Sequence, residues 1–445
     1  MRDIAVTLIV FGVLPYILMR PHIGVYAWSW IGYMAPHRLG WGFAANLPFA
    51  ALIGAATLVA LLFSKEPKRI PLTPITVTLI VFLVWMVITT IFAIHPDEAM
   101  AKLSKVLKIQ LMIFLTLMLF NHRERIHGLV WVIVISLGFY GVKGGIFTLL
   151  TGGQFHVVGP PGSFIVGNTS LALALVMVVP LMWYLYTQAD NKWVKRGLIA
   201  AMGFSALSIL GSYSRGGLLA IAAMGAFMLL KSKKRGLMIV VLVLSIPVAI
   251  AFMPERWTAR MQTVQTYEED ASAMGRITAW LFAIEMAKGR FLGGGFESFT
   301  PANYHLYAPE VVEMLMEKAA GRYQGAHSSY FSVLGEHGFV GLFLFLTLGF
   351  VSWRTASWIT KYAADSDSLA WAKELAGMIQ VSLVGFAVGG AFLSLAYFDL
   401  LYHLMALLVL LKLQVVQSLA AGNANGQSPL SQDNRKISMQ RRGGY

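Results

Sequence analysis

Long apolar runs follow one another along most of the chain and predict membrane-spanning helices. A span needs about 20 mostly apolar residues, and lipid offers backbone groups no partner outside a helix or a closed barrel. The runs are continuous rather than alternating, which favours helices. They lie at about 42–63, 74–94, 105–120, 127–150, 165–186, 197–211, 216–231, 237–253, 328–350, 375–396 and 398–417. We therefore expect an all-α, polytopic integral membrane protein.

The two ends of the chain are less regular. Two apolar pieces within residues 1–40 are broken at Arg20 and Pro21, because proline removes a backbone donor and ends a helix. This region is predicted to be one crossing or a bent pair. We expect a single transmembrane domain over residues 1–420. The tail, 421–445, is rich in Gly, Asn, Gln and Ser, and is predicted to be disordered and cytoplasmic.

Short basic loops set the expected orientation. Cytoplasmic loops carry an excess of Lys and Arg. The loops that do so here alternate correctly for one common side, and they lie at 64–69, 121–125, 188–196 and 231–235. The connection 151–162 has no Lys or Arg and fits the opposite side.

The same register places three features outside: the turn 212–217, the loop 95–105 and the long segment 254–326. Loops as long as the last are usually functional or disordered. It contains an amphipathic stretch, Arg276–Lys288, which predicts a folded helix on the membrane surface. The apolar positions at helical spacing are Ile277, Trp280, Leu281, Ile284 and Ala287.

Composition narrows the class of protein. Only 13% of the 445 residues are charged, about half the share of a soluble domain. The formal charge of +14 is interpreted as a topology signal in the loops, so no nucleic-acid partner is expected. The absence of cysteine excludes disulfides, Cys-ligated zinc and thiol nucleophiles.

Three arginines are candidates for binding an anion. Arg215 lies between two apolar runs, where a cation so close to hydrocarbon is a functional candidate, although it can also snorkel to the interface. Arg276 begins the predicted loop helix, whose free N–H groups can help it hold a phosphate; the alternative is a solvated surface arginine. Arg290 precedes Gly293–Gly295, which either let a ligand approach the backbone or form a turn.

Two histidines are candidates for proton transfer. His327 lies where the long segment returns to the membrane, and an imidazole near neutral pKa can take a proton from a hydroxyl nucleophile. His337 lies roughly 15 Å further along a straight helix. The two should not act on one atom, so His327 is the predicted base.

Two further charges could support the site. Asp399 lies between two apolar runs near the outer face, where it could orient a histidine or neutralise an arginine. Lys143 is embedded in an apolar run, and it could face a lipid phosphate or snorkel.

Missing motifs matter as well. The sequence has no Gly-x-x-x-x-Gly-Lys-Ser/Thr loop and no Asp-x-Asp pair in an outer loop. We therefore expect no nucleotide hydrolysis, no metal and no cofactor. Arginines at a membrane surface can bind a lipid diphosphate, and the candidate base can activate a hydroxyl. The combination therefore suits a transfer reaction in which a lipid diphosphate is the leaving group.

Two motifs carry a resemblance to a known family. One is Ser214-Arg215-Gly216 opening a membrane helix. The other is His327-Ser328, followed after nine residues by Gly338 and then by Gly341. With these motifs the chain resembles the O-antigen ligases, within the ligase/polymerase superfamily of bacterial surface polysaccharide assembly.

The resemblance implies a bacterial inner-membrane glycosyltransferase with a GT-C-like fold, about 12 transmembrane helices, a large periplasmic loop and both chain ends cytoplasmic. That count requires residues 1–40 to make one net crossing. The implied donor is a polysaccharide on undecaprenyl diphosphate, and the implied acceptor is a sugar hydroxyl of lipid A–core. The implied reaction is metal-independent and inverting. His327 is the implied general base, and Arg215 and Arg276 bind the diphosphate.

Other functions stay open at this point. An O-antigen polymerase would use another lipid-linked repeat as acceptor, and a protein O-oligosaccharyltransferase would use a Ser or Thr side chain. A lipid or solute transporter belongs to a different class. Transporters tend to show internal repeats around a midplane site. No repeat is evident here, and the unusual charges gather at one face.

Overall fold

The computed structural model describes residues 1–40, 42–231, 236, 253–255, 257, 271–319, 321–364 and 366–424. All regular structure in this part of the chain is helical. The α-helices are α1 (Arg2–Met19), α2 (Pro21–Met34), α3 (Phe49–Phe63), α4 (Pro74–Ile91), α5 (Pro96–Leu119), α6 (Arg123–Leu150), α7 (Asn168–Gln188), α8 (Lys192–Gly211), α9 (Arg215–Lys231), α12 (Ala271–Gly289), α13 (Pro301–Tyr307), α14 (Pro309–Lys318), α15 (Ser329–Tyr362), α16 (Ala370–Gly389) and α17 (Asp399–Ala424). Short 3-10 turns are η1 (Pro36–Leu39), η2 (Phe43–Asn46) and η3 (Asp367–Leu369).

Eight of the described helices are long and apolar enough to cross a membrane: α1, α4, α6, α7, α8, α15, α16 with η3, and α17. The all-α, polytopic class is therefore supported, while the total of about twelve spans stays a prediction. Apart from Met253, the predicted run 237–253 lies outside the described residues, as does the tail beyond Ala424.

The first two helices form a hairpin. Asp3, at the start of α1, accepts a hydrogen bond from the Ala44 N–H at 3.1 Å. Near the break at Arg20, the Tyr26 hydroxyl donates to the Arg125 carbonyl at 2.9 Å, at the opposite end of the bundle. Residues 1–40 are thus a bent pair, and the single net crossing that the resemblance required is wrong.

The basic loops meet at one end of the bundle, which we call the basic end. The Arg125 guanidinium pairs with Glu66 at 2.7 Å and joins the loop after α3 to the start of α6. Arg123 donates to the Gln188 side chain at 3.3 Å, which adds the end of α7. The predicted grouping is confirmed for the loops 64–69, 121–125 and 188–196, whereas 232–235 lies outside the described residues.

The predicted outer loops meet at the other end, which we call the site end. The Ile94 N–H, between α4 and α5, donates to the Gly294 carbonyl at 3.0 Å. The Asn168 side chain, at the start of α7, donates to the Ser212 carbonyl at 2.6 Å in the turn between α8 and α9. The turn, the loop and the described part of the long segment therefore share one end, as predicted.

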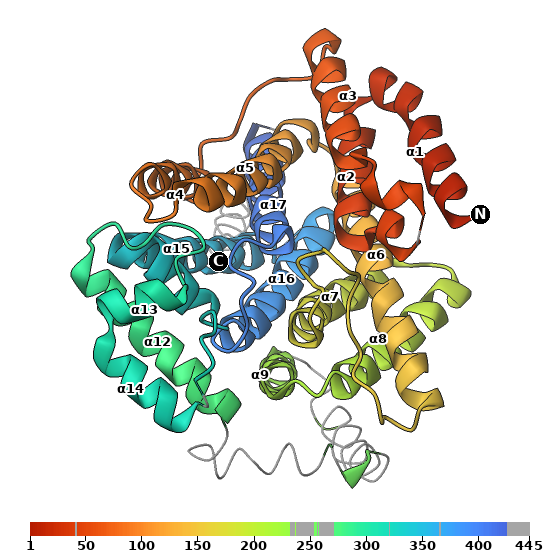
Figure 1. The fold of residues 1–445 in the computed structure, drawn as a ribbon. Helices are drawn as coiled ribbons and strands as arrows, with labels where there is room; N and C mark the ends of the chain where they lie inside the picture. Colours follow the sequence, from red (N-terminus) through yellow and green to blue (C-terminus); the bar gives the residue numbers. More distant parts are fainter. Residues whose placement is uncertain are drawn as a thin grey trace, which may run out of the picture.

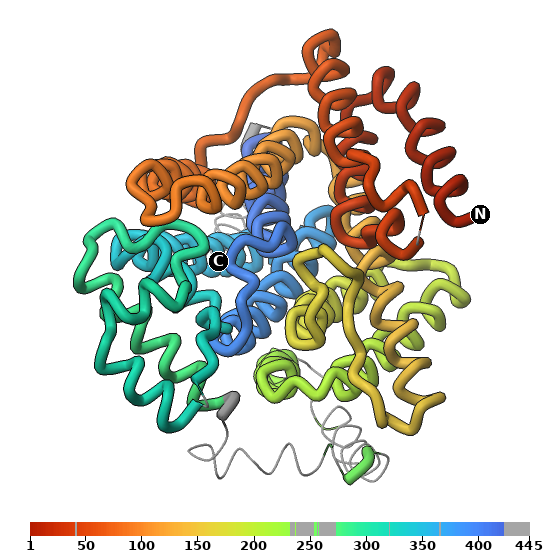
Figure 2. The backbone as a smooth tube through the Cα atoms, viewed as in Figure 1, coloured from red at the N-terminus to blue at the C-terminus, as the bar shows by residue number. Residues whose placement is uncertain are grey.

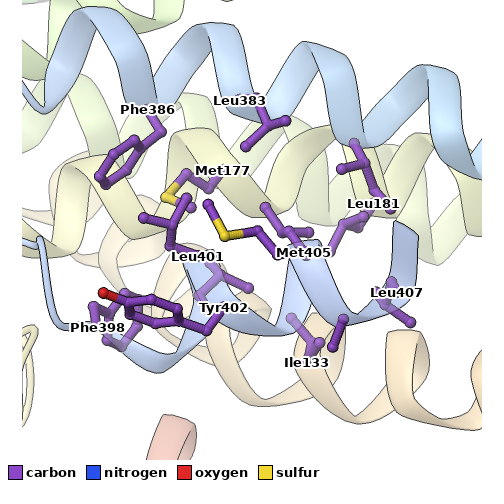
Figure 3. Packing of buried hydrophobic residues seen from close by; sticks show 14 of the residues in the cluster. Ile133, Met177, Leu181, Leu383, Phe386, Phe398, Leu401, Tyr402, Met405 and Leu407 are labelled. Carbon is purple, nitrogen blue, oxygen red and sulfur yellow. The ribbon is translucent and has the colours of Figure 1, made fainter. Parts of the chain in front are cut away.

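Helix α17 runs through the middle of the bundle, with α12–α14 on one flank and α1–α3 on the other (Figure 1). Its first half is buried on all sides, as expected for a helix that is apolar all round. Figure 3 shows this core, in which Leu401 and Met405 of α17 pack with Met177 of α7 and with Leu383 and Phe386 of α16.

The same helix connects the two ends. It begins with Asp399 at the site end, and its Gln414 side chain donates to the Asn121 carbonyl at 2.6 Å at the basic end. The start of α1 and the end of α17 therefore lie at opposite ends of the bundle. This contradicts the expectation that both chain ends face the same side.

Helices α12, α13 and α14 form a lobe beside α15, visible as the green and teal part of the tube (Figure 2). The helix predicted at Arg276–Lys288 is confirmed within α12, and of its five apolar positions Ala287 is buried. The fully buried positions are Thr278, Ala279, Phe282, Ala283 and Met286, whereas Ile277, Trp280, Leu281 and Ile284 are only partly buried. The reason is that α12 packs on α13 and α14 with one side and on α15 with another.

The hairpin generates a topological prediction. Because the chain lacks cysteine, single cysteines at exposed positions report on sidedness without background. In sealed membrane vesicles, Arg2→Cys and Glu310→Cys should react with an impermeant maleimide under the same conditions, and Lys192→Cys should react only in the opposite vesicle orientation. Labelling of Arg2→Cys together with Lys192→Cys would contradict the hairpin.

Candidate active site

The first part of the site is the start of α9. The Ser214 hydroxyl accepts a hydrogen bond from the Gly217 N–H at 3.0 Å, so this serine is a helix N-cap. Tyr213 before it has a positive φ of 55°, and its hydroxyl donates to the Gly153 carbonyl at 2.6 Å. The tight turn places half-buried Arg215 on the first turn of the helix, at the site end.

The second part is the joint between α12 and the start of α15. The Trp280 indole N–H donates to the Ala326 carbonyl at 2.8 Å, and its ring stacks on Phe331 with centroids 5.0 Å apart. His327 follows directly, with a positive φ of 43° and an exposed side chain. This backbone conformation costs conformational energy in a residue other than glycine. Such strained residues cluster at functional sites.

Arg276 and His327 interact electrostatically. His327 is open to solvent, yet the surrounding protein removes part of its hydration and lowers the imidazole pKa below the usual 6.5. The Arg276 guanidinium lowers this pKa further. At neutral pH the imidazole is therefore uncharged and can accept a proton.

The loop after α16 joins these two parts. The Ser329 N–H donates to the Gly390 carbonyl at 2.7 Å, which attaches the start of α15 to the loop. On the other side of the loop, a Cβ on Gly216 would lie 3.0 Å from the Phe392 Cβ. The Phe392 ring in turn lies 6.2 Å from the Trp280 ring. The elements that carry Arg215, Arg276 and His327 thus meet at one short loop.

Arg290 and the glycines after α12 have a structural role. Arg290 donates to the carbonyls of Phe92 at 2.7 Å and Gly293 at 3.1 Å. The N–H groups of Gly294 and Gly295 donate at 2.8 Å to the carbonyls of Gly335 and Glu336. These carbonyls precede a break in α15, where Gly338 has a φ of 67°. The glycine run therefore packs against the broken helix.

His337 is enclosed in the core. Its side chain is fully buried, and its Nδ1 lies 2.7 Å from the Thr89 hydroxyl. Its ring meets Phe296 edge-on at 4.6 Å, and its carbonyl accepts from the Trp85 indole at 2.9 Å. A side chain with no exposed surface has no access to a substrate hydroxyl in this conformation.

The two remaining candidates lie apart from His327. Asp399 is buried at the start of α17 and faces another cavity, which also contains Lys105. Lys143 is exposed on α6, while Gly144 and Gly145 beside it pack against α8. Sequence reasoning missed Glu336, which is buried and accepts from the Tyr397 hydroxyl at 2.6 Å. Its neighbour His337 could be chosen from the sequence as a candidate, because histidine titrates near neutral pH. A single glutamate in an apolar run has no comparable property that would mark it as a candidate.

The fold and the site define a polytopic helical membrane protein with cations around an exposed histidine at one end of the bundle. Residues 200–346 match the family described as O-antigen ligase. Residues 1–190 match a family of unknown function, DUF5935. No curated protein matches the chain.

The ligase match supports placing the chain in the O-antigen ligase/polymerase superfamily. It suggests a glycosyltransferase-like enzyme of ligase/polymerase type that acts on lipid-linked polysaccharide in a membrane. Arg215, Arg276 and His327 all lie in the matched region, as do Arg290 and His337.

The electrostatic interaction between Arg276 and His327 predicts a pH dependence. If neutral His327 is required, the rate of transfer should fall with acid along a limb whose midpoint lies below 6.5. Arg276→Gln removes a positive charge that disfavours the imidazolium, so the His327 pKa and the acid limb should move to higher pH. Arg276→Lys keeps the charge and serves as control. A pH–rate profile measures this, and an acid limb that stays in place in Arg276→Gln would show that the two groups do not interact.

Proposed function

We propose that the protein is an O-antigen ligase, which transfers polysaccharide from undecaprenyl diphosphate to a sugar hydroxyl of lipid A–core. The observation that carries the proposal is an exposed His327 whose pKa is lowered by desolvation and by the Arg276 charge, within the region that matches the O-antigen ligase family. The basic end then faces the cytoplasm by the positive-inside rule, and the site end faces the periplasm.

The chemistry assigns one role to each group. The acceptor hydroxyl oxygen attacks the anomeric carbon of the donor sugar, and the bond from that carbon to the diphosphate oxygen breaks. The hydroxyl proton passes to the neutral His327 imidazole. Arg215 and Arg276 stabilise the charge of the departing undecaprenyl diphosphate, and a single displacement inverts the anomeric centre.

Arginines can perform this task without a divalent ion. A planar guanidinium donates two parallel hydrogen bonds to phosphate oxygens. These bonds offset the negative charge of the phosphate and fix its orientation. Within the described residues, no group of three or more His, Asp or Glu side chains is placed to hold a metal. We therefore propose that transfer is metal-independent.

The polymerase and the protein O-oligosaccharyltransferase would use the same donor site and differ in the acceptor. A deletion strain distinguishes them by its lipopolysaccharide bands. Loss of the ligase should leave lipid A–core bare while lipid-linked polymer accumulates. Core that carries a single repeat would identify a polymerase instead, and unchanged lipopolysaccharide would argue for a protein acceptor.

The mechanism predicts a division of labour among the site residues. Loss of a charge-assisted contact to phosphate costs about 1.5–3 kcal/mol, so Arg215→Ala and Arg276→Ala should weaken donor binding and slow transfer. Lysine should restore part of each loss, because it keeps the charge but not the planar fork. His327→Ala should bind donor normally and lose about 10²–10⁴-fold in single-turnover rate.

His337→Gln is the matched control, because it changes a nearby imidazole that lies on the following helix, α15, and is buried in the core. It should keep most of the transfer rate in protein that folds normally. Normal transfer by His327→Ala, together with loss of transfer in folded His337→Gln, would show that the wrong histidine has been chosen.

A further inference from the structure

A basic cavity lies at the site end, where Asp399 at the start of α17 lines it. It has a volume of about 240 Å³ and lies among α2, η1, α3, α5 and the loop before α7. Arg38, Lys105 and Lys108 contribute three cations to its lining, and Asp399 contributes one carboxylate. The cavity therefore carries a net positive charge at the end of the bundle where the positive-inside rule predicts few cations.

The cations are held by their surroundings but not neutralised. Lys105 Nζ lies 4.1 Å from the centre of the Phe164 ring, a cation–π distance. The Arg38 guanidinium packs against Gly162, where φ is +67° and an added Cβ would collide with Nη1. In the described part of the chain, the ion pairs are formed by other residues. The cations are thus positioned without a protein anion that binds them directly.

Nearby groups also favour an anionic ligand. His37 lines the cavity, and its Nδ1 is buried without a hydrogen-bond partner among the described residues. An unpaired buried polar atom is costly, and a ligand oxygen or a water can satisfy it. Several N–H donors around one space suit the oxygens of a phosphate.

The other wall of the cavity is apolar. Trp28 and Ile31 of α2 and Ile109 of α5 lie beneath the cations. A free inorganic phosphate gains nothing from such a wall, whereas a lipid buries apolar surface against it.

We propose that this cavity binds a phosphate group carried by a membrane lipid, separately from the donor diphosphate. If the proposed function is right, that lipid is the acceptor glycolipid, whose phosphate would fix its position while its sugar hydroxyl reaches His327. Separate anion sites suit two anionic lipids, because both could bind at once without sharing one set of cations.

The experiment measures binding by the purified full-length protein in detergent. The probes are phosphorylated lipid A, the same lipid after removal of its phosphates, and inorganic phosphate alone. Wild-type protein should bind phosphorylated lipid A at least tenfold more tightly than the dephosphorylated form, and millimolar inorganic phosphate should compete poorly. Arg38→Gln/Lys105→Gln/Lys108→Gln should lose the difference between the two lipids.

Lys102→Gln is the matched control, because Lys102 lies one turn from Lys105 on α5 but pairs with Glu297 at 2.7 Å. It should bind like wild type. Arg215→Ala should lose transfer yet keep the preference for phosphorylated lipid A, which separates failure of the proposed function from failure of this site. Equal binding of the two lipids by wild type would overturn the proposal, even if the triple variant does not fold. Equally strong binding of inorganic phosphate would assign the cavity to the free anion instead.

Discussion

The break in α15 is the constraint on which the site depends. Lipid leaves no solvent partner for backbone groups, so carbonyls released by a broken helix must be bonded from within the protein. The N–H groups of Gly294 and Gly295 do this for Gly335 and Glu336. A Cβ on Gly338 would lie 2.3 Å from the Phe291 carbonyl, so only glycine allows such close packing. The chain after α12 is thereby fixed to α15, and so is the lobe that carries Arg276.

The same packing explains why His327 has a defined position although it lies outside a helix. The Trp280 indole holds the carbonyl before it, and Ser328 caps α15 after it, with its hydroxyl accepting from the Phe331 N–H at 3.5 Å. Both anchors belong to elements that the broken helix brings together. Arg276 lies on the same helix as Trp280, so a shift of the lobe would move the cation and the base together.

The sequence was informative where one residue carries a strong local signal. Hydropathy predicted most of the described apolar helices, and the alternation of basic loops correctly grouped the two ends of the bundle. Arg215, Arg276 and His327 could be selected because each lies at a junction between apolar and polar segments. Contacts between distant segments could not be predicted, such as the hydrogen bonds from Arg290 to the Phe92 and Gly293 carbonyls. The buried face of α12 was also missed, because periodicity does not reveal that a helix packs on two neighbours.

The two groups of cations at the site end follow from one electrostatic argument. Desolvation and, after it, the Arg276 charge lower the His327 pKa, so both favour the neutral imidazole and oppose the imidazolium that would form in the proposed transfer. In the proposed reaction, the departing diphosphate offsets that repulsion, because its negative charge grows beside the arginines in the same step. A second anion bound to these arginines would weaken this coupling. In the proposed arrangement, Arg38, Lys105 and Lys108 hold the phosphate of the other lipid, and Arg276 is left to the leaving group.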